Sequence, residues 1–167
     1  MSAEPEGYRE FVEIRLDGLR RTAYLLCGDW HTADDLVSAA LIKLLRHWRR
    51  VCAMSHPDAY LRQILLHVWL DERRRPWRRE QSWAHPPDRY QAGPESGLDR
   101  LAVLGFLAEL TPRRRAVLVL RYFCDLTVEE TAETLGISPG TVKSQTARAL
   151  QAVRAHLLDE PAGMDRE

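Results

Sequence analysis

Apolar residues recur at three- and four-residue spacing along the first 75 positions of the chain. Such spacing places side chains on one face of an α-helix, and it predicts helices over residues 8–26, 32–50 and 58–75. The apolar face of the second helix comprises Leu36, Val37, Ala40, Leu41, Leu44 and Leu45, and that of the third comprises Leu61, Ile64, Leu65 and Val68. Leu66 and Leu70 add apolar surface to the other side of the third helix, which indicates that it lies between neighbours.

Residues 81–97, QSWAHPPDRYQAGPESG, lose this periodicity and gather proline, glycine and serine. That composition is typical of a flexible linker. Because the sequence carries no alternating strand pattern, we expect an all-α protein of two small helical domains, 1–80 and 98–158, followed by an acidic tail, 159–167. Trp69 is expected in the core, and Pro76 should end the third helix near Arg75.

The C-terminal half carries three signals for the start of a helix. Thr111-Pro112 and Ser138-Pro139 each place a capping side chain before a proline at the first helical position. Thr127 to Glu130 has the spacing of a capping box, in which the hydroxyl and the carboxylate each satisfy a backbone amide. Gly136 lies between the last two starts, where a tight turn with positive φ is easiest for glycine.

The spacing of Ala132, Gly136 and Val142 is typical of a helix-turn-helix, in which a small residue allows close approach, glycine forms the corner and valine anchors the second helix. On that helix Val142, Thr146, Ala149, Leu150, Val153 and Leu157 share one side, and Ser144, Ala147, Arg148 and Gln151 share the other, with Lys143 on the flank. No acid occurs between Glu133 and Asp159, so this outer face does not repel phosphate. It predicts duplex DNA binding; the alternative is an ordinary helical hairpin with a basic outer face.

Charge is segregated along the chain although the net charge is zero. Residues 61–79 hold six arginines against two acids, and residues 111–158 hold seven basic against four acidic residues. The segment between them, 80–110, and the tail are both net acidic. Two basic segments separated by an acidic one indicate two contact surfaces for a polyanion.

Several classes of function are not indicated by the sequence. It has no Gly-rich phosphate loop, no GxSxG motif and no histidine pair with metal-ligand spacing, so we expect no enzyme activity, no metal and no cofactor. No apolar run approaches the roughly 18 residues that span a bilayer, and the acidic N-terminus lacks a signal core, which predicts a cytoplasmic protein without membrane insertion. Cys27, Cys52 and Cys124 show no CxxC spacing and are expected to be buried free thiols.

Long stretches of the chain resemble bacterial sigma-70-type factors. The segment LAELTPRRRAVLVLRYFCDLTVEETAETLGISPGTVKSQTARALQAVRAHL is similar to domain 4 of these proteins, and TADDLVSAALIKLLRHW and PDAYLRQILLHVWLDERRR are similar to domain 2. The absence of a third domain between them resembles the extracytoplasmic-function (ECF) group, and DERRRPWRRE resembles its actinobacterial SigE-like subset. The similarity covers about residues 8–158, in the family's own domain order.

The resemblance implies a transcription initiation factor that binds core RNA polymerase and directs it to specific promoters. Domain 2 would open the minus-ten element and hold its non-template strand, and domain 4 would place its second helix-turn-helix helix in the major groove of the minus-35 element. An anti-sigma factor is a further partner that the resemblance suggests. No catalytic residue is implied, because the polymerase supplies the chemistry.

The resemblance also assigns residues to these roles by position. Contacts with the minus-35 element fall to Thr141, Lys143, Ser144, Gln145, Ala147 and Arg148, of which Thr141 and Gln145 would lie near phosphate. Contacts with the minus-ten strand fall to Tyr60, Arg62, Gln63, His67, Arg73, Arg74 and Arg75. Docking on the polymerase falls to Asp34, Asp35, Leu36 and Val37. The loop from Val51 to Pro57 matches the segment that captures a flipped minus-ten base, and Arg113 to Arg115 and Arg121 would lie near the DNA backbone or the polymerase flap.

Ser38 and Ala39 stand where many relatives carry a glutamine and an acid, so some of the polar contacts with the polymerase clamp are not expected here. Many relatives carry asparagine in place of His67 and arginine in place of Gln145, which suggests an unusual promoter preference. Two other classes of function remain open at this stage. One is a stand-alone helix-turn-helix regulator that binds duplex DNA without polymerase, with residues 1–80 as a dimerisation or sensor domain. The other is a pure protein-interaction module, such as an antagonist built on the same fold.

Overall fold

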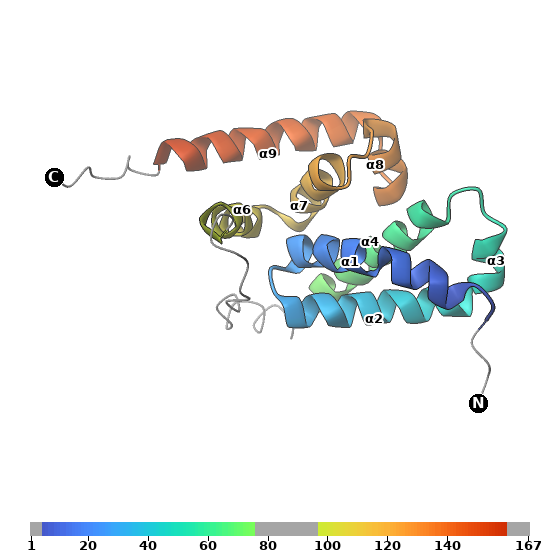
Figure 1. The fold of residues 1–167 in the computed structure, drawn as a ribbon. Helices are drawn as coiled ribbons and strands as arrows, with labels where there is room; N and C mark the ends of the chain where they lie inside the picture. Colours follow the sequence, from blue (N-terminus) through green and yellow to red (C-terminus); the bar gives the residue numbers. More distant parts are fainter. Residues whose placement is uncertain (1–4, 76–96, 160–167) are drawn as a thin grey trace. The chain divides into compact units, whose positions relative to one another are not determined.

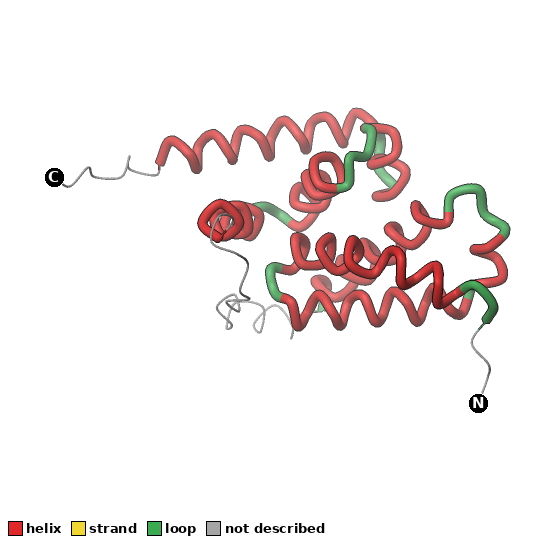
Figure 2. Tube along the Cα trace, in the orientation of Figure 1, coloured by secondary structure: helices red, strands yellow, loops and turns green. Residues whose placement is uncertain are grey.

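The computed structural model describes residues 5–75 and 97–159 of the chain. The protein divides into two compact units, with the boundary between Gln91 and Ala92. Every regular element in the described ranges is helical, which confirms the all-α prediction (Figures 1 and 2). The predicted linker, residues 81–97, lies outside the described residues except for Gly97, which begins a helix.

The N-terminal unit consists of α1 (Tyr8–Cys27), α2 (Trp30–Arg46), α3 (Trp48–Cys52) and α4 (Pro57–Arg74). Helix α2 packs against both α1 and α4, and α4 also contacts α1 (Figure 1). The largest fully buried side chains of this unit are Leu26, Leu36, Leu44, Val51, Leu65, Leu66 and Trp69. They come from all four helices, so one shared core holds the unit together.

The predicted helix over 32–50 is interrupted. Helix α2 begins earlier, at Trp30, because the Asp29 carboxylate accepts a hydrogen bond of 2.8 Å from the Thr32 amide as an N-cap. It ends at Arg46, where His47 leaves helical geometry before α3 begins. This break turns Trp48 into the core, and it leaves Leu45, predicted on the buried face, 41% exposed.

The predicted helix over 58–75 is confirmed as α4. Leu61, Ile64, Leu65 and Val68 of its first apolar side are buried, and on the other side Leu66 is buried and Leu70 is half-buried. Trp69 is in the core, as expected. The helix ends at Arg74, just before the position at which Pro76 was expected to stop it.

The C-terminal unit consists of α6 (Gly97–Glu109), α7 (Pro112–Leu118), the π-helical segment η2 (Val119–Phe123), α8 (Val128–Leu135) and α9 (Pro139–Asp159). Val117, Ala132 and Val142 form one buried cluster that joins α7, α8 and α9. Val128, Leu135 and Ile137 pack around this cluster. The helix-turn-helix predicted from the small residue, the glycine and the valine is therefore confirmed.

All three predicted helix starts are present. The Thr111 hydroxyl accepts from the Arg114 amide at 3.4 Å, and the Ser138 hydroxyl accepts from the Thr141 amide at 3.1 Å. Thr127 and Glu130 form both hydrogen bonds of a capping box. Gly136 ends α8 with φ of +64°, as the corner of the motif requires.

Two glycines of the C-terminal unit should respond oppositely to the same substitution. Gly136→Ala is expected to destabilise the unit by about 1–2 kcal/mol, because a Cβ is unfavourable at its left-handed φ although no other atom lies within 4 Å. Gly105→Ala, within α6 and equally uncrowded, is expected to stabilise by about 0.4–1 kcal/mol. Urea unfolding followed by circular dichroism measures both changes. A Gly136→Ala protein as stable as the wild type would contradict the assigned corner.

Candidate nucleic-acid and polymerase interfaces

The outer face of α9 carries the residues predicted to read the minus-35 element. Lys143, Ser144, Ala147 and Arg148 are exposed, whereas Val142 and Ala149 are fully buried on the opposite side. The Ser144 hydroxyl donates to the Thr141 carbonyl at 3.1 Å, so its oxygen presents an acceptor outward. The first turns of α9 therefore display two cations, a small hydroxyl and a methyl group, a set suited to base edges in a major groove.

Thr141 and Gln145 lie on the flank of α9 rather than on its outer face, and both are half-buried. The Gln145 amide oxygen accepts a hydrogen bond of 3.2 Å from Arg114 Nε of α7. Thr141 Oγ1 lies 2.8 Å from the Ser138 hydroxyl within the N-terminal turn. The structure thus adds Arg114 to this flank, a neighbour that sequence spacing did not identify because it lies 31 residues away.

Arg115 and Arg121, both predicted near the DNA backbone or the polymerase flap, are not exposed: Arg121 is half-buried and Arg115 is buried. Arg115 is only 5% exposed. Arg121 Nη1 donates to the Leu126 carbonyl and so closes the turn before α8. The prediction of surface contacts is therefore wrong for Arg115, whereas Arg113 is exposed and Arg114 is half-buried.

The residues predicted to hold the minus-ten strand divide between two sides of α4. Tyr60, Gln63, His67 and Arg74 follow one another at spacings of three, four and seven, which places them on one face away from the buried Leu61 and Leu65. His67 is exposed rather than part of the core.

Arg62 and Arg73 lie on another flank of α4 and are half-buried. The Arg73 guanidinium carbon lies 5.7 Å from the centre of the Trp69 ring, a cation–π arrangement that orients the side chain. Arg75 is exposed just beyond the end of the helix.

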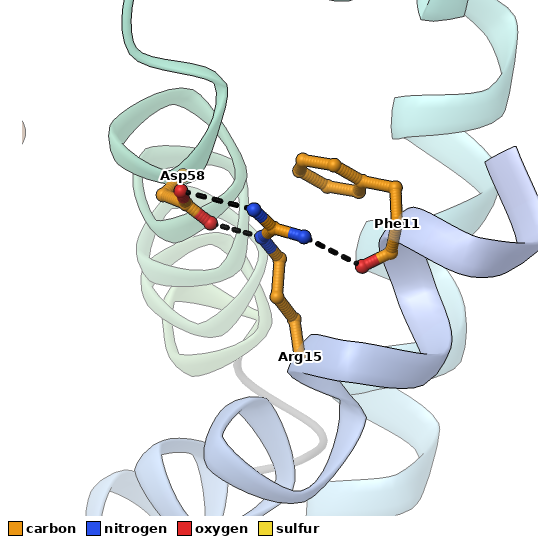
Figure 3. A network of polar contacts seen from close by, with 3 residues as sticks. All are labelled: Phe11, Arg15 and Asp58. Carbon is orange, nitrogen blue, oxygen red and sulfur yellow. Dashed lines mark hydrogen bonds and ion pairs between the residues drawn. The ribbon is translucent and has the colours of Figure 1, made fainter. Parts of the chain in front are cut away.

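The loop between α3 and α4 comprises residues 53–56. At its far end the Asp58 carboxylate forms a bidentate ion pair with Arg15 of α1, with Arg15 Nη2 3.2 Å from Oδ2 and Arg15 Nε bonded to Oδ1 (Figure 3). The hydrogen bond from Arg15 lowers the pKa of Asp58 below its ordinary value, against the opposing effect of burial. Ala53, Ser55 and His56 of the loop are exposed.

The four residues predicted to dock on polymerase lie in the first turns of α2, where two are exposed and two are buried. Asp34 and Asp35 are exposed, but Leu36 and Val37 are 2% and 3% exposed and belong to the core. Leu36 and Val37 therefore cannot contact the polymerase directly, because their side chains pack α2 against its neighbours in the core. Asp34 is itself paired with Arg20 of α1, with Nε–Oδ1 and Nη2–Oδ2 distances of 2.6 and 3.1 Å.

The cysteines are free but not all buried. Cys52 is exposed, contrary to prediction, because it ends the one-turn helix α3, and Cys27 and Cys124 are half-buried. Across residues 5–75 and 97–159, no three potential ligands come together to hold a metal ion. None of the helices in these ranges is both long and apolar enough to cross a bilayer.

Comparison with known proteins places each unit in one family. Residues 11–79 match the family model "Sigma-70 region 2", and residues 100–153 match "Sigma-70, region 4". The region 2 match lies in the N-terminal half of the chain. The alternative hypothesis of a stand-alone regulator treated that half as a dimerisation or sensor domain. Among solved structures, the sigma factor RpoE of Bartonella quintana, in complex with the anti-sigma factor NepR, has the same fold, with a TM-score of 0.76 and 22% identity over 94% of this chain and 100% of that one.

Two curated relatives extend the match over nearly the whole length. The RNA polymerase sigma-E factor of Streptomyces coelicolor is 34% identical over 90% of this chain and 86% of its own. The ECF RNA polymerase sigma factor SigL of Mycobacterium tuberculosis is 32% identical over 93% of this chain and 92% of its own. The chain therefore belongs to the extracytoplasmic-function group of sigma-70-type RNA polymerase sigma factors, which are transcription initiation factors that direct the polymerase to promoters.

Proposed function

We propose that the two units divide promoter recognition between them. The N-terminal unit, with a boundary near residue 80, docks on core RNA polymerase and holds the non-template strand of the minus-ten element. The C-terminal unit, over residues 98–158, reads the minus-35 duplex, and residues 81–97 link the two. The proposal rests on the separate basic surfaces that each unit presents and on the family match of each.

The outer face of α9 is the observation that carries the proposal. It combines Lys143, Ser144, Ala147 and Arg148 on an exposed, acid-free surface whose opposite side is anchored by Val142. Arginine or lysine can bond guanine in a bidentate manner, and the N-terminal residues of a recognition helix are those that reach base edges. Thr141 and the Arg114–Gln145 pair flank this face, where Arg114 can meet phosphate.

On the N-terminal unit, the face of α4 formed by Tyr60, Gln63, His67 and Arg74 is suited to a single strand. It offers an aromatic ring for stacking, amide and imidazole groups for base edges, and a cation for phosphate. Arg75 extends the positive charge beyond the helix, and Arg62 and Arg73 border it. We assign base and strand contacts to this face and backbone contacts to the bordering arginines.

For docking on the polymerase we retain the exposed carboxylates and omit the buried apolar pair. Asp35 is exposed on α2, and Asp34 is exposed but paired with Arg20, so Arg20 has to be considered part of the same surface. An anti-sigma factor is a second proposed partner. Exposed apolar side chains such as Tyr122, Phe123, Leu157 and Leu158 are of the kind that a protein partner covers.

Site-specific crosslinking tests the division of roles. A photoreactive residue at Ala147 should crosslink to minus-35 duplex DNA, and one at His67 should crosslink to the minus-ten non-template strand, in complexes of the full chain with core polymerase on a promoter selected from a random library. The same residue at Glu133, exposed on α8, serves as a control site. Crosslinking of both Ala147 and His67 variants to the same element would contradict the proposal.

A further inference from the structure

Helix α1 contacts both of the helices that flank the loop between α3 and α4. On the side before the loop, Trp48 of α3 packs edge-on against Tyr8 and Phe11 of α1, with ring centres 5.3 and 5.1 Å apart. Trp48 Nε1 also donates to the Glu6 carbonyl at 3.0 Å. On the side after the loop, Asp58 in the first turn of α4 is paired with Arg15 of α1. Successive turns of α1 therefore contact the two helices between which the loop runs.

Arg15 connects these two contacts. Its Nε and Nη2 bond the Asp58 carboxylate, and its Nη1 donates to the Phe11 carbonyl at 3.0 Å (Figure 3). Its guanidinium carbon also lies 3.8 Å from the centre of the Phe11 ring. Since a guanidinium is planar and all three of its nitrogens are used, its orientation is fixed relative to both partners. We call Phe11, Arg15 and Asp58 the α1 brace.

The Arg15–Asp58 ion pair is expected to contribute little to the free energy of unfolding. Arg15 and Asp58 are 29% and 53% exposed, and ion pairs between exposed side chains contribute little to folding because water and salt screen them. The pair can instead affect binding, because it restricts the conformations of a short loop. A loop that is already ordered loses less conformational freedom when it binds, so its affinity for a ligand rises.

We propose that Arg15 is a positioning residue for the base-capturing loop: through Asp58 it holds the start of α4 so that residues 53–56 are preorganised to receive an unstacked base of the non-template strand. This inference rests on the proposed role of the N-terminal unit in holding the minus-ten strand and on the base capture that the family resemblance implies for the loop. Arg15 lies on α1, outside all the residues assigned to DNA, and acts without touching the strand. A flipped base is recognised by a pocket that is shaped in advance, which is the property that the brace supplies.

The test is a double-mutant cycle between the protein and the DNA. Full-length protein bound to core polymerase is titrated with a promoter containing an unpaired minus-ten region, in which each non-template base in turn is replaced by an abasic site. In the wild type, removal of the captured base should weaken binding by about 5- to 150-fold, the range for one stacked base. In Arg15→Ala the same removal should weaken binding less than in the wild type, with the penalty reduced by up to about fivefold, because the Arg15–Asp58 pair contributes at most about 1 kcal/mol to holding the loop in place. Arg15→Gln should behave like Arg15→Ala, and Arg15→Lys, which retains the charge, should recover part of the penalty.

Ile64→Val is the matched control. Ile64 is buried in α4, six residues after Asp58, and its truncation costs about 0.5–1.5 kcal/mol of stability. This variant should keep the full abasic penalty, so loss of the penalty in it would mean that general loosening explains the effect and would overturn the inference. An undiminished penalty in both Arg15→Ala and Arg15→Gln would also overturn it. If the wild type shows no penalty at any position, the proposed role of the loop fails, and the inference fails with it.

Discussion

Replacing Arg148 by alanine is expected to reduce transcription from the preferred promoter by about 5- to 150-fold, since one bidentate contact with a base is worth about 1–3 kcal/mol. Arg148 is exposed on α9, on the face that also carries Ser144. The loss should depend on sequence: changing the contacted base pair should reduce wild-type activity by a similar factor and have little further effect in the variant. Run-off transcription on a set of singly substituted minus-35 elements measures this.

Arg154→Ala is the control for the Arg148 variant. Arg154 is an equally charged and exposed residue of the same helix, about 9 Å further along its axis. We expect its loss to affect all promoters alike and to reduce the salt dependence of binding, as removal of a phosphate contact does. If Arg148→Ala reduced transcription from all promoters by the same factor, the assignment of Arg148 to base reading would be wrong.

Trp48→Ala is expected to destabilise the N-terminal unit by about 3–5 kcal/mol, the range for removal of a large buried aromatic side chain. Trp48 is only 6% exposed and connects α3 to α1 through Tyr8, Phe11 and the Glu6 carbonyl. Loss of these contacts should release α3 and, with it, the loop that follows, for which the family resemblance implies base capture. Hydrogen exchange resolved over α1 to α4, together with urea unfolding, measures the change.

Trp48→Phe separates packing from the indole hydrogen bond. It retains an aromatic ring against Tyr8 and Phe11 and loses the bond to Glu6, which should cost only about 0.5–1.5 kcal/mol beyond the change in volume. The amides of α8 and α9 should exchange as in the wild type in both variants. A Trp48→Ala protein whose N-terminal unit was destabilised by less than about 1 kcal/mol would show that Trp48 is not the link described.

The features that were predictable from the sequence are those encoded by neighbouring residues. The caps at Thr111, Thr127 and Ser138 and the corner at Gly136 each depend on side chains within a few positions, so their hydrogen bonds were confirmed as expected. The outer face of α9 was also predictable, because a helix of known register fixes which residues oppose Val142.

What the sequence did not predict depends on residues far apart in the chain. Arg15 and Asp58 are 43 positions apart, and Arg114 and Gln145 are 31 positions apart, so no local spacing indicates either pair. Trp48, which follows the break at His47, also has its partners far away in the chain, in Glu6 and Phe11. The π-helical turn Val119–Phe123, which leaves Tyr122 and Phe123 exposed, likewise has no local sequence signal.

The assigned site residues show the same division. The sequence identified α2 as the docking helix but did not separate the exposed Asp34 and Asp35 from Leu36 and Val37, because family resemblance assigns whole segments rather than faces. On α4, helical spacing alone separates the Tyr60, Gln63, His67 and Arg74 face from Arg62 and Arg73. Burial does not divide the two groups further, because Tyr60 and Gln63 are half-buried like Arg62 and Arg73, and only His67 and Arg74 are exposed.

Transcription with core polymerase tests the central claim most directly. Core enzyme is incubated with and without the full chain on a library with random minus-35 and minus-ten elements, and the transcripts are sequenced. We expect transcripts only with the chain present, enriched for one sequence at each element. Lys143→Ala and Arg148→Ala should alter the selected minus-35 sequence alone, and His67→Ala should alter the minus-ten sequence alone. Absence of enrichment at either element, or a change at both elements in each variant, would show that the two units do not divide promoter recognition between them.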